Sequence, residues 1–242
     1  MTNADAFDQP LLHLTPLELD RQYQVFGRFY GMPRTGESYR CRDRLEIHRG
    51  NERDDECDAI FIMMNPGSSE PLVGLSTAPK QQAVMVPTEA DITQLMRLMG
   101  VLGWKRVRVL NLSDLRNAKS ASFYVALSDF ATREGHDGHS IFSGARQSEL
   151  ACALSRKSGA SVISALGVSK KLGALAETAM RSLGRTNLGL GHQNGPWAFR
   201  HPLPKTDPQQ TEWRVDALRM LKAASGARTE SPSPSVPPVL GK

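Results

Sequence analysis

Polar side chains follow several apolar stretches of the chain, at the points where these stretches end. The segment Asn65-Pro66-Gly67-Ser68-Ser69 follows the uncharged run 59–64, and Asn111 lies at the end of the next apolar stretch. A third apolar stretch ends in Gly167, and a short extended stretch leads to His201. An amide carries both a donor and an acceptor, and a neutral imidazole still has one N–H to donate. Such groups can orient a polar substrate and stabilise a leaving anion without a metal.

The elements that position these residues are predicted to be buried strands. A short apolar run without alternation is typical of a strand covered on both faces, as in a parallel sheet. Pro66 and Gly67 end the first such strand, because proline lacks a ladder N–H and glycine tolerates unusual backbone angles. We predict strands over 59–64, 106–112 and 161–167, and an edge strand over 39–48 whose arginines form a solvated face. We predict helices over 15–30, 88–102, 120–130, 141–158, 169–183 and 209–224.

Strands that alternate with helices predict a three-layer α/β/α fold with a mostly parallel central sheet. Right-handed crossovers place the carboxyl ends of parallel strands on one side, so Asn65, Asn111 and His201 are expected to share one cleft. The long loop 68–87 is of a length that usually has a function or is disordered.

The expected domain organisation has three parts. An N-terminal helical extension covers residues 1–38, a single α/β domain covers 39–225, and a Ser- and Pro-rich tail covers 226–242. We expect this tail to be disordered, because it has too little apolar surface to bury.

Composition narrows the class of protein. The chain has 242 residues and a formal net charge of +5, which suits one large domain and favours an anionic partner such as DNA. Its three cysteines, Cys41, Cys57 and Cys152, form neither a disulfide framework nor a Cys-x-x-Cys pair. The longest apolar runs are far shorter than the roughly 20 residues that span a membrane, and the N-terminus has no apolar signal core. We expect a cytoplasmic monomer that binds DNA and no membrane.

Four segments, taken in order, resemble motifs of the uracil-DNA glycosylase superfamily. Met64-Asn65-Pro66-Gly67-Ser68-Ser69 resembles the Gly-Ile-Asn-Pro-Gly motif of the mismatch-specific and thymine-DNA glycosylase branch. Val109-Leu110-Asn111-Leu112 resembles the strand that ends in the base-reading asparagine. The segment 162–167 is similar to the apolar strand before the final motif, and His201-Pro202-Leu203-Pro204 resembles the His-Pro-Ser-Pro loop. The chain also resembles a bacterial and phage family of uncharacterised domains with Asn-Pro-Ser and His-Pro-Leu signatures.

The chain departs from the family's pattern at three points. Met64 stands where the first motif has its leading glycine, and Leu203 replaces the middle serine of the last motif. The iron–sulfur branch binds its cluster through four cysteines, whereas this chain has three, so we predict no cluster. These departures affect the choice of substrate more than the chemistry.

The resemblance implies a monofunctional DNA glycosylase that works without a metal or cofactor. Asn65 and His201 would be catalytic: the Asn65 carbonyl would orient a water molecule, and His201 would donate a hydrogen bond to the departing base. Asn111 would read the edge of the flipped pyrimidine. The first-motif residues Pro66, Gly67, Ser68 and Ser69 would bind substrate, with Ser68 and Ser69 holding a DNA phosphate.

The last motif and its neighbours are predicted to contact DNA. Arg200 and Lys205 would pair with phosphates, and Leu203 would wedge into the duplex where the base has left. No aromatic residue follows Asn65 before Trp104. This absence leaves room beside the 5-position of the ring, so we expect a modified pyrimidine to be preferred over uracil, in DNA repair or in defence against phage.

Two alternative functions remain open. A charge of +5 is small for a DNA enzyme, so the same cleft could serve a hydrolase of nucleosides or nucleotides. The sequence also places no carboxylate beside Asn65, which favours a catalytically inactive nucleic-acid-binding module.

Overall fold

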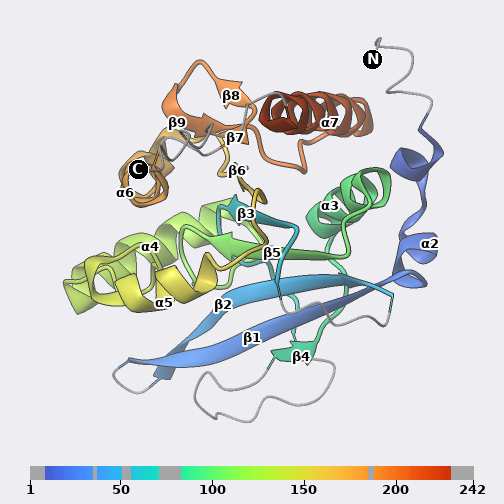
Figure 1. Ribbon diagram of the computed structural model, residues 1–242. Coiled ribbons are helices and arrows are strands. Elements are labelled where there is room, and N and C mark those ends of the chain that lie inside the picture. The colour runs from blue at the N-terminus through green and yellow to red at the C-terminus, as the bar shows by residue number, and fades with distance from the viewer. Residues whose placement is uncertain (1–8, 35–36, 51–55, 71–82, 185–187, 230–242) are drawn as a thin grey trace, which may run out of the picture.

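The computed structural model describes residues 9–34, 37–50, 56–70, 83–184 and 188–229. Seven strands form one sheet in the order β4-β1-β2-β5-β3-β6-β7, and helices cover both of its faces (Figure 1). The strands of this sheet are β1 (Tyr23–Arg34), β2 (Glu37–Arg49), β3 (Ala59–Met63), β4 (Ala83–Met85), β5 (Arg106–Asn111), β6 (Ser161–Ser164) and β7 (Leu188–Gly189). A separate antiparallel pair consists of β8 (Gly191–His192) and β9 (Gly195–Phe199).

The helices lie in two layers. The longer ones are α3 (Ala90–Leu102), α4 (Ser120–Glu134), α6 (Gly173–Leu183) and α7 (Asp207–Thr229), and the shorter ones are α2 (Pro16–Asp20) and α5 (Gln147–Ala153). Three 3₁₀ turns are η1 (Pro10–His13), η2 (Gly144–Arg146) and η3 (Lys170–Leu172). One layer contains α3 and α7, and the other contains α4, α5 and α6, as Figure 1 shows. The predicted α/β architecture with helices on both faces is therefore confirmed.

The sheet is mixed, whereas the sequence predicted a mostly parallel one. Strands β5, β3, β6 and β7 run parallel to one another, but β2, β1 and β4 continue the sheet in antiparallel pairing. β2 was predicted as an edge strand and instead lies between β1 and β5. The sequence pattern predicts a helix over 15–30, where the structure has most of β1, and β2 therefore lacks a predicted partner on that side.

The predicted helix over 15–30 is largely wrong. Its start is confirmed, because Thr15 accepts a hydrogen bond from the Glu18 backbone N–H and the Glu18 carboxylate accepts one from the Thr15 backbone N–H. The helix nevertheless ends at Asp20, and β1 begins at Tyr23. Tyr23 and its alternate neighbours Val25 and Phe29 are buried on the α3 side, a period of two that belongs to a strand. Much of the expected helical extension is thus part of the sheet.

The buried run that precedes Asn65 behaves as predicted. All five residues of β3 are almost completely buried. Ala59, Phe61 and Met63 pack toward α3 and α7, while Ile60 and Ile62 pack toward α4, α5 and α6. The strand therefore holds the first motif at the centre of the molecule.

Other predicted elements differ at their ends. The helix expected over 141–158 is confined to η2 and α5. The loop expected over 68–87 contains β4, while its segment 71–82 lies outside the described residues. α7 continues to Thr229, so the first residues of the tail that we expected to be disordered are helical, and 230–242 lie outside the described residues. Within the described part of the chain, no helix is long and apolar enough to cross a membrane.

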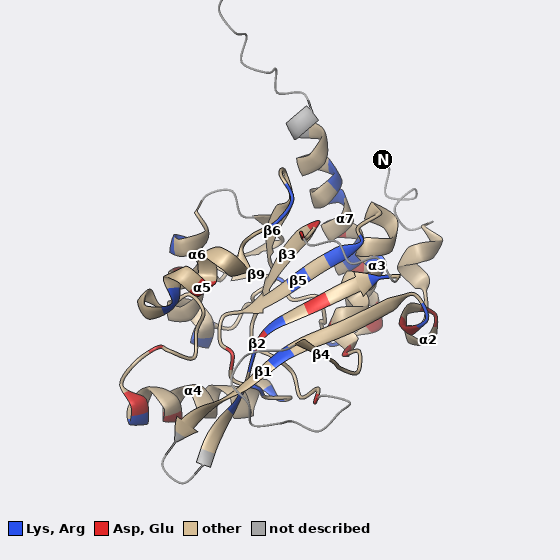
Figure 2. Ribbon diagram, turned by 60° about the horizontal axis from the view of Figure 1, so that its bottom comes forward, with Lys and Arg blue, Asp and Glu red and all other residues tan. Residues whose placement is uncertain are grey.

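Charged residues of both signs lie on the central strands β2 and β5 of the sheet (Figure 2). Glu46 on β2 is buried and accepts hydrogen bonds from Arg108 Nε at 2.7 Å and from Arg106 Nε at 3.1 Å. Arg42 on β2 is also buried. The expectation that the arginines of this strand face solvent is therefore wrong for Arg42, which pairs with Glu89, whereas Arg40 is exposed as expected.

A bulge interrupts the β1–β2 ladder. Arg28 pairs with Arg44 and Phe29 pairs with Arg42, so Asp43 is an extra residue on β2. Asp43 is completely buried and forms an ion pair with Arg28 at 2.6 Å. The extra residue lets Arg42 pack beside the start of α3, where it contacts Glu89.

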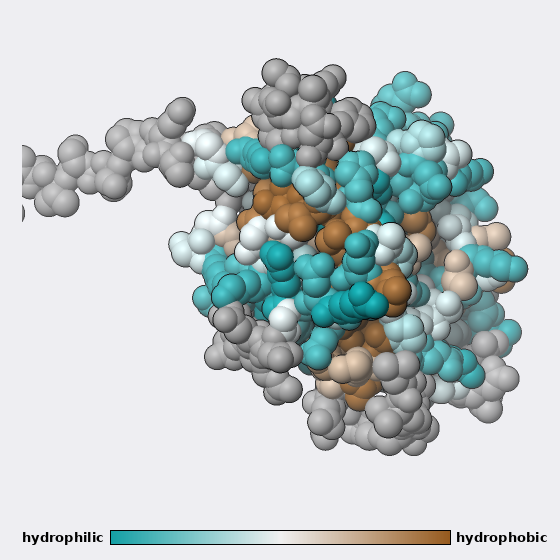
Figure 3. Space-filling view, turned by 90° about the vertical axis from the view of Figure 1, so that its right-hand side faces the viewer, coloured by the Kyte–Doolittle hydropathy of each residue, from teal (hydrophilic) through white to brown (hydrophobic). Residues whose placement is uncertain are grey.

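The surface over η1, α2 and α3 is mostly hydrophilic. In Figure 3, apolar residues on the described part of this face lie in narrow strips between polar ones. These strips are of the kind that any folded domain leaves exposed.

Candidate functional site

The order of the parallel strands defines where a ligand is expected to bind. Along the sheet they run β5-β3-β6-β7, so the strand that comes first in the sequence lies between the second and the third. The connection from β3 to β5 contains α3 on one face, and the connection from β5 to β6 contains α4 and α5 on the other. The direction of winding therefore reverses at β3 and β6, and open α/β sheets bind ligands at the carboxyl ends of the strands at such a reversal.

Backbone hydrogen bonds link the segments that lead to the first and last motifs to the end of β6. The Ala165 backbone N–H at the end of β6 donates to Ile62 O of β3 at 2.8 Å. Two residues further on, Gly167 N–H donates to Phe199 O at 2.9 Å, and His201 follows Phe199 by two residues. Asn65 follows Ile62 by three residues, so the loops that carry Asn65 and His201 leave neighbouring strand ends.

The Asn65 side chain is fixed by two carbonyl groups. Its Nδ2 donates to Pro66 O at 2.7 Å and to Asn117 O at 2.9 Å, in the loop that follows β5. Because both partners are acceptors, the amide nitrogen must be the atom that faces them. Oδ1 is left without a hydrogen-bond partner among the described residues, and Asn65 is only half-buried. Its carbonyl is thus a preoriented acceptor, which is what the orientation of a water molecule requires.

Asn111 is more enclosed than the sequence suggested. It pairs with Met63 across the β3–β5 ladder, which places it at the same end of the sheet, but only 1% of it is exposed. Its Nδ2 is buried and has no partner among the described residues. An unsatisfied buried donor costs about 1–3 kcal/mol, which an acceptor on a substrate would recover.

His201 is a neutral hydrogen-bond donor. The residue is half-buried, and burial lowers its pKa to about 4. Its Nδ1 lies 3.2 Å from the Leu203 backbone N–H and accepts a hydrogen bond from it. This contact assigns the proton to Nε2, so the imidazole has one N–H to offer at neutral pH.

We expect the His201 ring to remain neutral from pH 8 to about pH 5. Its folded-state pKa of about 4 lies below the usual histidine value of 6.5, so protonation favours the unfolded chain. The stability that the neutral ring contributes is therefore complete above pH 6.5 and is lost as the pH falls toward 4. A proton NMR titration of the wild type, with His201→Ala to assign the signal, measures this pKa. A midpoint near 6.5 would contradict it.

Glu89 is a site residue that the sequence did not reveal. A Cβ at Gly67 would lie 1.8 Å from Glu89 Oε1, so any larger residue there would have to displace this carboxylate. Glu89 Oε1 accepts from Ser69 N–H at 3.2 Å, and Oε2 accepts from Arg42 Nη1 at 3.2 Å. Glu89 also precedes Asp91 by two residues, and burial, reinforced by Glu89, raises the pKa of Asp91 to about 6. Nothing in the local sequence links Glu89 to Gly67, because 21 residues lie between them.

Several polar atoms of Ser68 and Ser69, which are predicted to bind substrate, form hydrogen bonds within the protein instead. Ser69 is buried, and its hydroxyl accepts from Arg42 Nη1 at 2.8 Å. The Ser68 and Ser69 carbonyls accept from Arg116 Nη2 at 3.0 and 2.7 Å. Since the Ser69 N–H also donates to Glu89, its N–H is not free for a phosphate, and its buried hydroxyl is held beside Arg42. Ser68 is exposed, and Pro66 is buried.

We expect Gly67→Ala to lower activity at this site by about tenfold. The new methyl group must displace the Glu89 carboxylate, which breaks its hydrogen bonds to Ser69 and Arg42 and shifts the loop after Asn65. Gly144→Ala is the matched control, because nothing lies within 4 Å of its Cβ position. If the clash is the cause, Gly67→Ala should add little in a Glu89→Ala background, which a double-mutant cycle on turnover measures. Additive effects would contradict this explanation.

The predicted DNA-binding residues near the last motif have different surroundings. Arg200 forms ion pairs with Asp216 at 2.9 Å and Glu212 at 3.3 Å on α7, so it is already engaged by carboxylates. Leu203 is 37% exposed, and Lys205 is exposed. Leu203 and Lys205 are therefore accessible to a partner, while Arg200 primarily ties the loop to α7.

Known proteins give no further guide to this site. A scan of protein-family models and searches of curated proteins and of solved structures found no match to the chain. In the part of the chain that the structure describes, no group of three or more His, Cys, Asp or Glu side chains is placed to hold a metal ion.

Proposed function

We propose that this protein is a monofunctional DNA glycosylase that removes a flipped-out pyrimidine and leaves an abasic site. The observation that supports the proposal is that the loops of Asn65 and His201 follow segments that are linked to β6 and its continuation by backbone hydrogen bonds, at the reversal point of the sheet. Asn65 offers a preoriented acceptor and His201 a neutral N–H donor. The four motifs that resemble the uracil-DNA glycosylase superfamily support the same function.

In the proposed reaction, the bond between C1′ of the sugar and the base nitrogen breaks first, and its electron pair leaves with the base. The sugar then has oxocarbenium character, as in other glycoside hydrolyses. Water held by the Asn65 carbonyl adds to C1′, and its proton neutralises the departing base. His201 Nε2–H stabilises the negative charge on a carbonyl oxygen of that base. Both residues act by position, so neither has to change its protonation state.

The proposed substrate is a pyrimidine with a substituent at its 5-position. The first motif carries no aromatic side chain that would fill this space. Ser69 is buried beside Arg42, whereas Ser68 is exposed, so we assign the hydrogen bond to a polar substituent to Ser68. Leu72 and Val73, which could fill the same space, lie outside the described residues.

The test is release of bases from duplexes that carry uracil, mismatched thymine or 5-hydroxymethylated pyrimidines. Abasic sites are detected by cleavage with alkali, and the released bases are identified by mass. His201→Ala should reduce release at least tenfold, whereas His136→Ala, in an exposed turn, should not. The absence of abasic sites on every duplex would refute the proposal, and uracil as the best substrate by tenfold would refute the preferred base.

A hydrolase of free nucleosides or nucleotides is the second candidate. It is favoured by the engagement of Arg200 and Ser69 with carboxylates and arginine, which leaves fewer groups for the phosphates of a DNA strand. Affinity for DNA should fall steeply between low and moderate salt if the protein is a glycosylase, but not if it acts on nucleosides. Glu89 brings a carboxylate to the first motif, which removes the observation that favoured an inactive binding module.

A further inference from the structure

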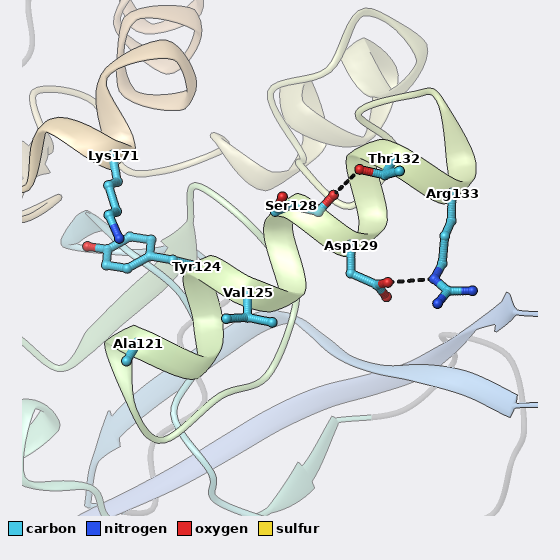
Figure 4. Close-up of a pocket in the computed structure, with 8 residues that line it drawn as sticks. All are labelled: Ala121, Tyr124, Val125, Ser128, Asp129, Thr132, Arg133 and Lys171. Atoms are coloured by element: carbon cyan, nitrogen blue, oxygen red, sulfur yellow. Dashed lines mark hydrogen bonds and ion pairs between the residues drawn. The ribbon is translucent and has the colours of Figure 1, made fainter.

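A hollow of about 690 Å³ lies beside α4 and contains none of the residues discussed so far. α4 supplies most of its wall, and Lys171, in η3, supplies the rest (Figure 4). α4 follows β5 and η3 follows β6, and these two strands lie on either side of β3. The hollow is therefore at the same end of the sheet as the two motif loops.

One contact links the hollow directly to the first motif. The Tyr124 hydroxyl, on the wall of the hollow, donates to Met64 Sδ at 3.8 Å. Met64 immediately precedes Asn65. A chain that entered the proposed active site would thus be within a short distance of Tyr124.

The hollow combines an aromatic ring with an unpaired cation. Lys171 Nζ lies 5.1 Å from the centroid of the Tyr124 ring, and Figure 4 shows the ammonium group directed at that ring. Lys171 is exposed and forms no ion pair within the described part of the chain. Asp129, the acidic residue of the lining, is paired with Arg133, so the hollow keeps a positive charge.

We propose that this hollow binds a nucleotide of a single DNA strand. Its base would stack on Tyr124, and its phosphate would pair with Lys171, which gives up its weak contact with the ring. Proteins that hold single strands combine aromatic platforms with cations in this way. The inference rests on the proposed function in one respect: this nucleotide is a neighbour, on the same strand, of the one whose base would enter beside Asn65.

The test is binding of a fluorescent oligodeoxyadenylate of about ten nucleotides at several salt concentrations. This strand contains no pyrimidine, so binding is measured apart from base release. Tyr124→Leu should weaken binding at least about fivefold without changing the salt dependence. Lys171→Gln should reduce the slope of log affinity against log salt by about 0.7, the value for one phosphate contact on a single strand.

Two variants control for other causes. Tyr124→Phe keeps the ring but removes the hydroxyl that contacts Met64, so it should bind as the wild type does. Lys222→Gln removes an exposed lysine from α7, in the other helix layer, and should leave the salt slope unchanged. Melting temperatures of all four variants show whether each is folded.

The inference is wrong if the wild type does not bind the strand, or if Tyr124→Leu and Lys171→Gln bind as the wild type does. Its failure is distinguishable from failure of the proposed function. If base release proceeds with an unchanged KM in Tyr124→Leu and Lys171→Gln, the hollow does not bind the strand, but the proposal of a glycosylase stands. If binding depends on Tyr124 and Lys171 but no duplex releases a base, the strand-binding hollow stands and the proposal of a glycosylase is wrong.

Discussion

Asn65→Ala is expected to lower base release about a hundredfold or more. The substitution removes the Oδ1 acceptor that would orient the attacking water. It also removes the two hydrogen bonds from Nδ2 that fix the loop to Pro66 O and Asn117 O. Loss of position at a reacting centre by about 1 Å costs roughly 10²-fold in rate. Single-turnover rates on the best duplex would measure the effect.

The control for this variant is Asn117→Ala. Asn117 contributes its backbone carbonyl to Asn65, and this carbonyl survives the substitution. The control should therefore retain near wild-type turnover. Asn65→Asp tests the two roles separately, because it keeps an acceptor but turns a carboxylate oxygen toward two carbonyl oxygens, and we expect it not to restore activity. Wild-type rates in Asn65→Ala would show that the residue only shapes its loop.

Glu46→Ala is expected to destabilise the fold by about 3–5 kcal/mol. Glu46 lies between Arg106 and Arg108, and the side chain of Arg108 is 5% exposed. Removal of one partner from a buried ion pair leaves an uncompensated charge, which costs about 3–5 kcal/mol. Glu46 also accepts from the Cys57 thiol, whose pKa is raised to about 11 by burial and next by the charge of Glu46. Urea denaturation would measure the change in the free energy of unfolding.

Two further variants show whether burial is the cause. Glu46→Gln keeps the shape and one acceptor, so it should cost less than the alanine variant. Glu212→Ala removes a carboxylate that is 61% exposed and pairs with Arg200, and exposed pairs of this kind contribute about 0–1 kcal/mol. Equal losses from Glu46→Ala and Glu212→Ala would contradict the assignment of a buried charge network.

The parts of the fold that could be predicted are those with a strong local signal. The uncharged run of β3, the capping box at Thr15 and the helix that contains α3 are each encoded within a few neighbouring residues. β1 escaped prediction because Thr15 and Pro16 are a strong helix start, and the alternation of Tyr23, Val25 and Phe29 is interrupted by Gly27. That glycine is required, since a Cβ there would lie 2.6 Å from the Phe29 ring.

The residues of the candidate site also differ in whether a local sequence signal indicates them. Asn65 and His201 could be proposed from the sequence, because each follows an extended segment and is followed by a proline. Glu89 and Arg42 could not, because their link to Gly67 and Ser69 depends on the packing of β2 against the start of α3. The arginines of β2 were taken for a solvated face, because the carboxylates that neutralise some of them come from other strands and helices.

The extra residue Asp43 limits which deletions the β1–β2 pair can tolerate. Because side chains alternate along a strand, loss of this one extra residue would exchange the two faces of β2 on the N-terminal side of the bulge. Tyr39 and Cys41 would leave the layer that contains α4, and Arg42 would no longer reach Ser69 or Glu89. We therefore expect the extra residue to persist wherever the loop at Ser69 is held by Arg42.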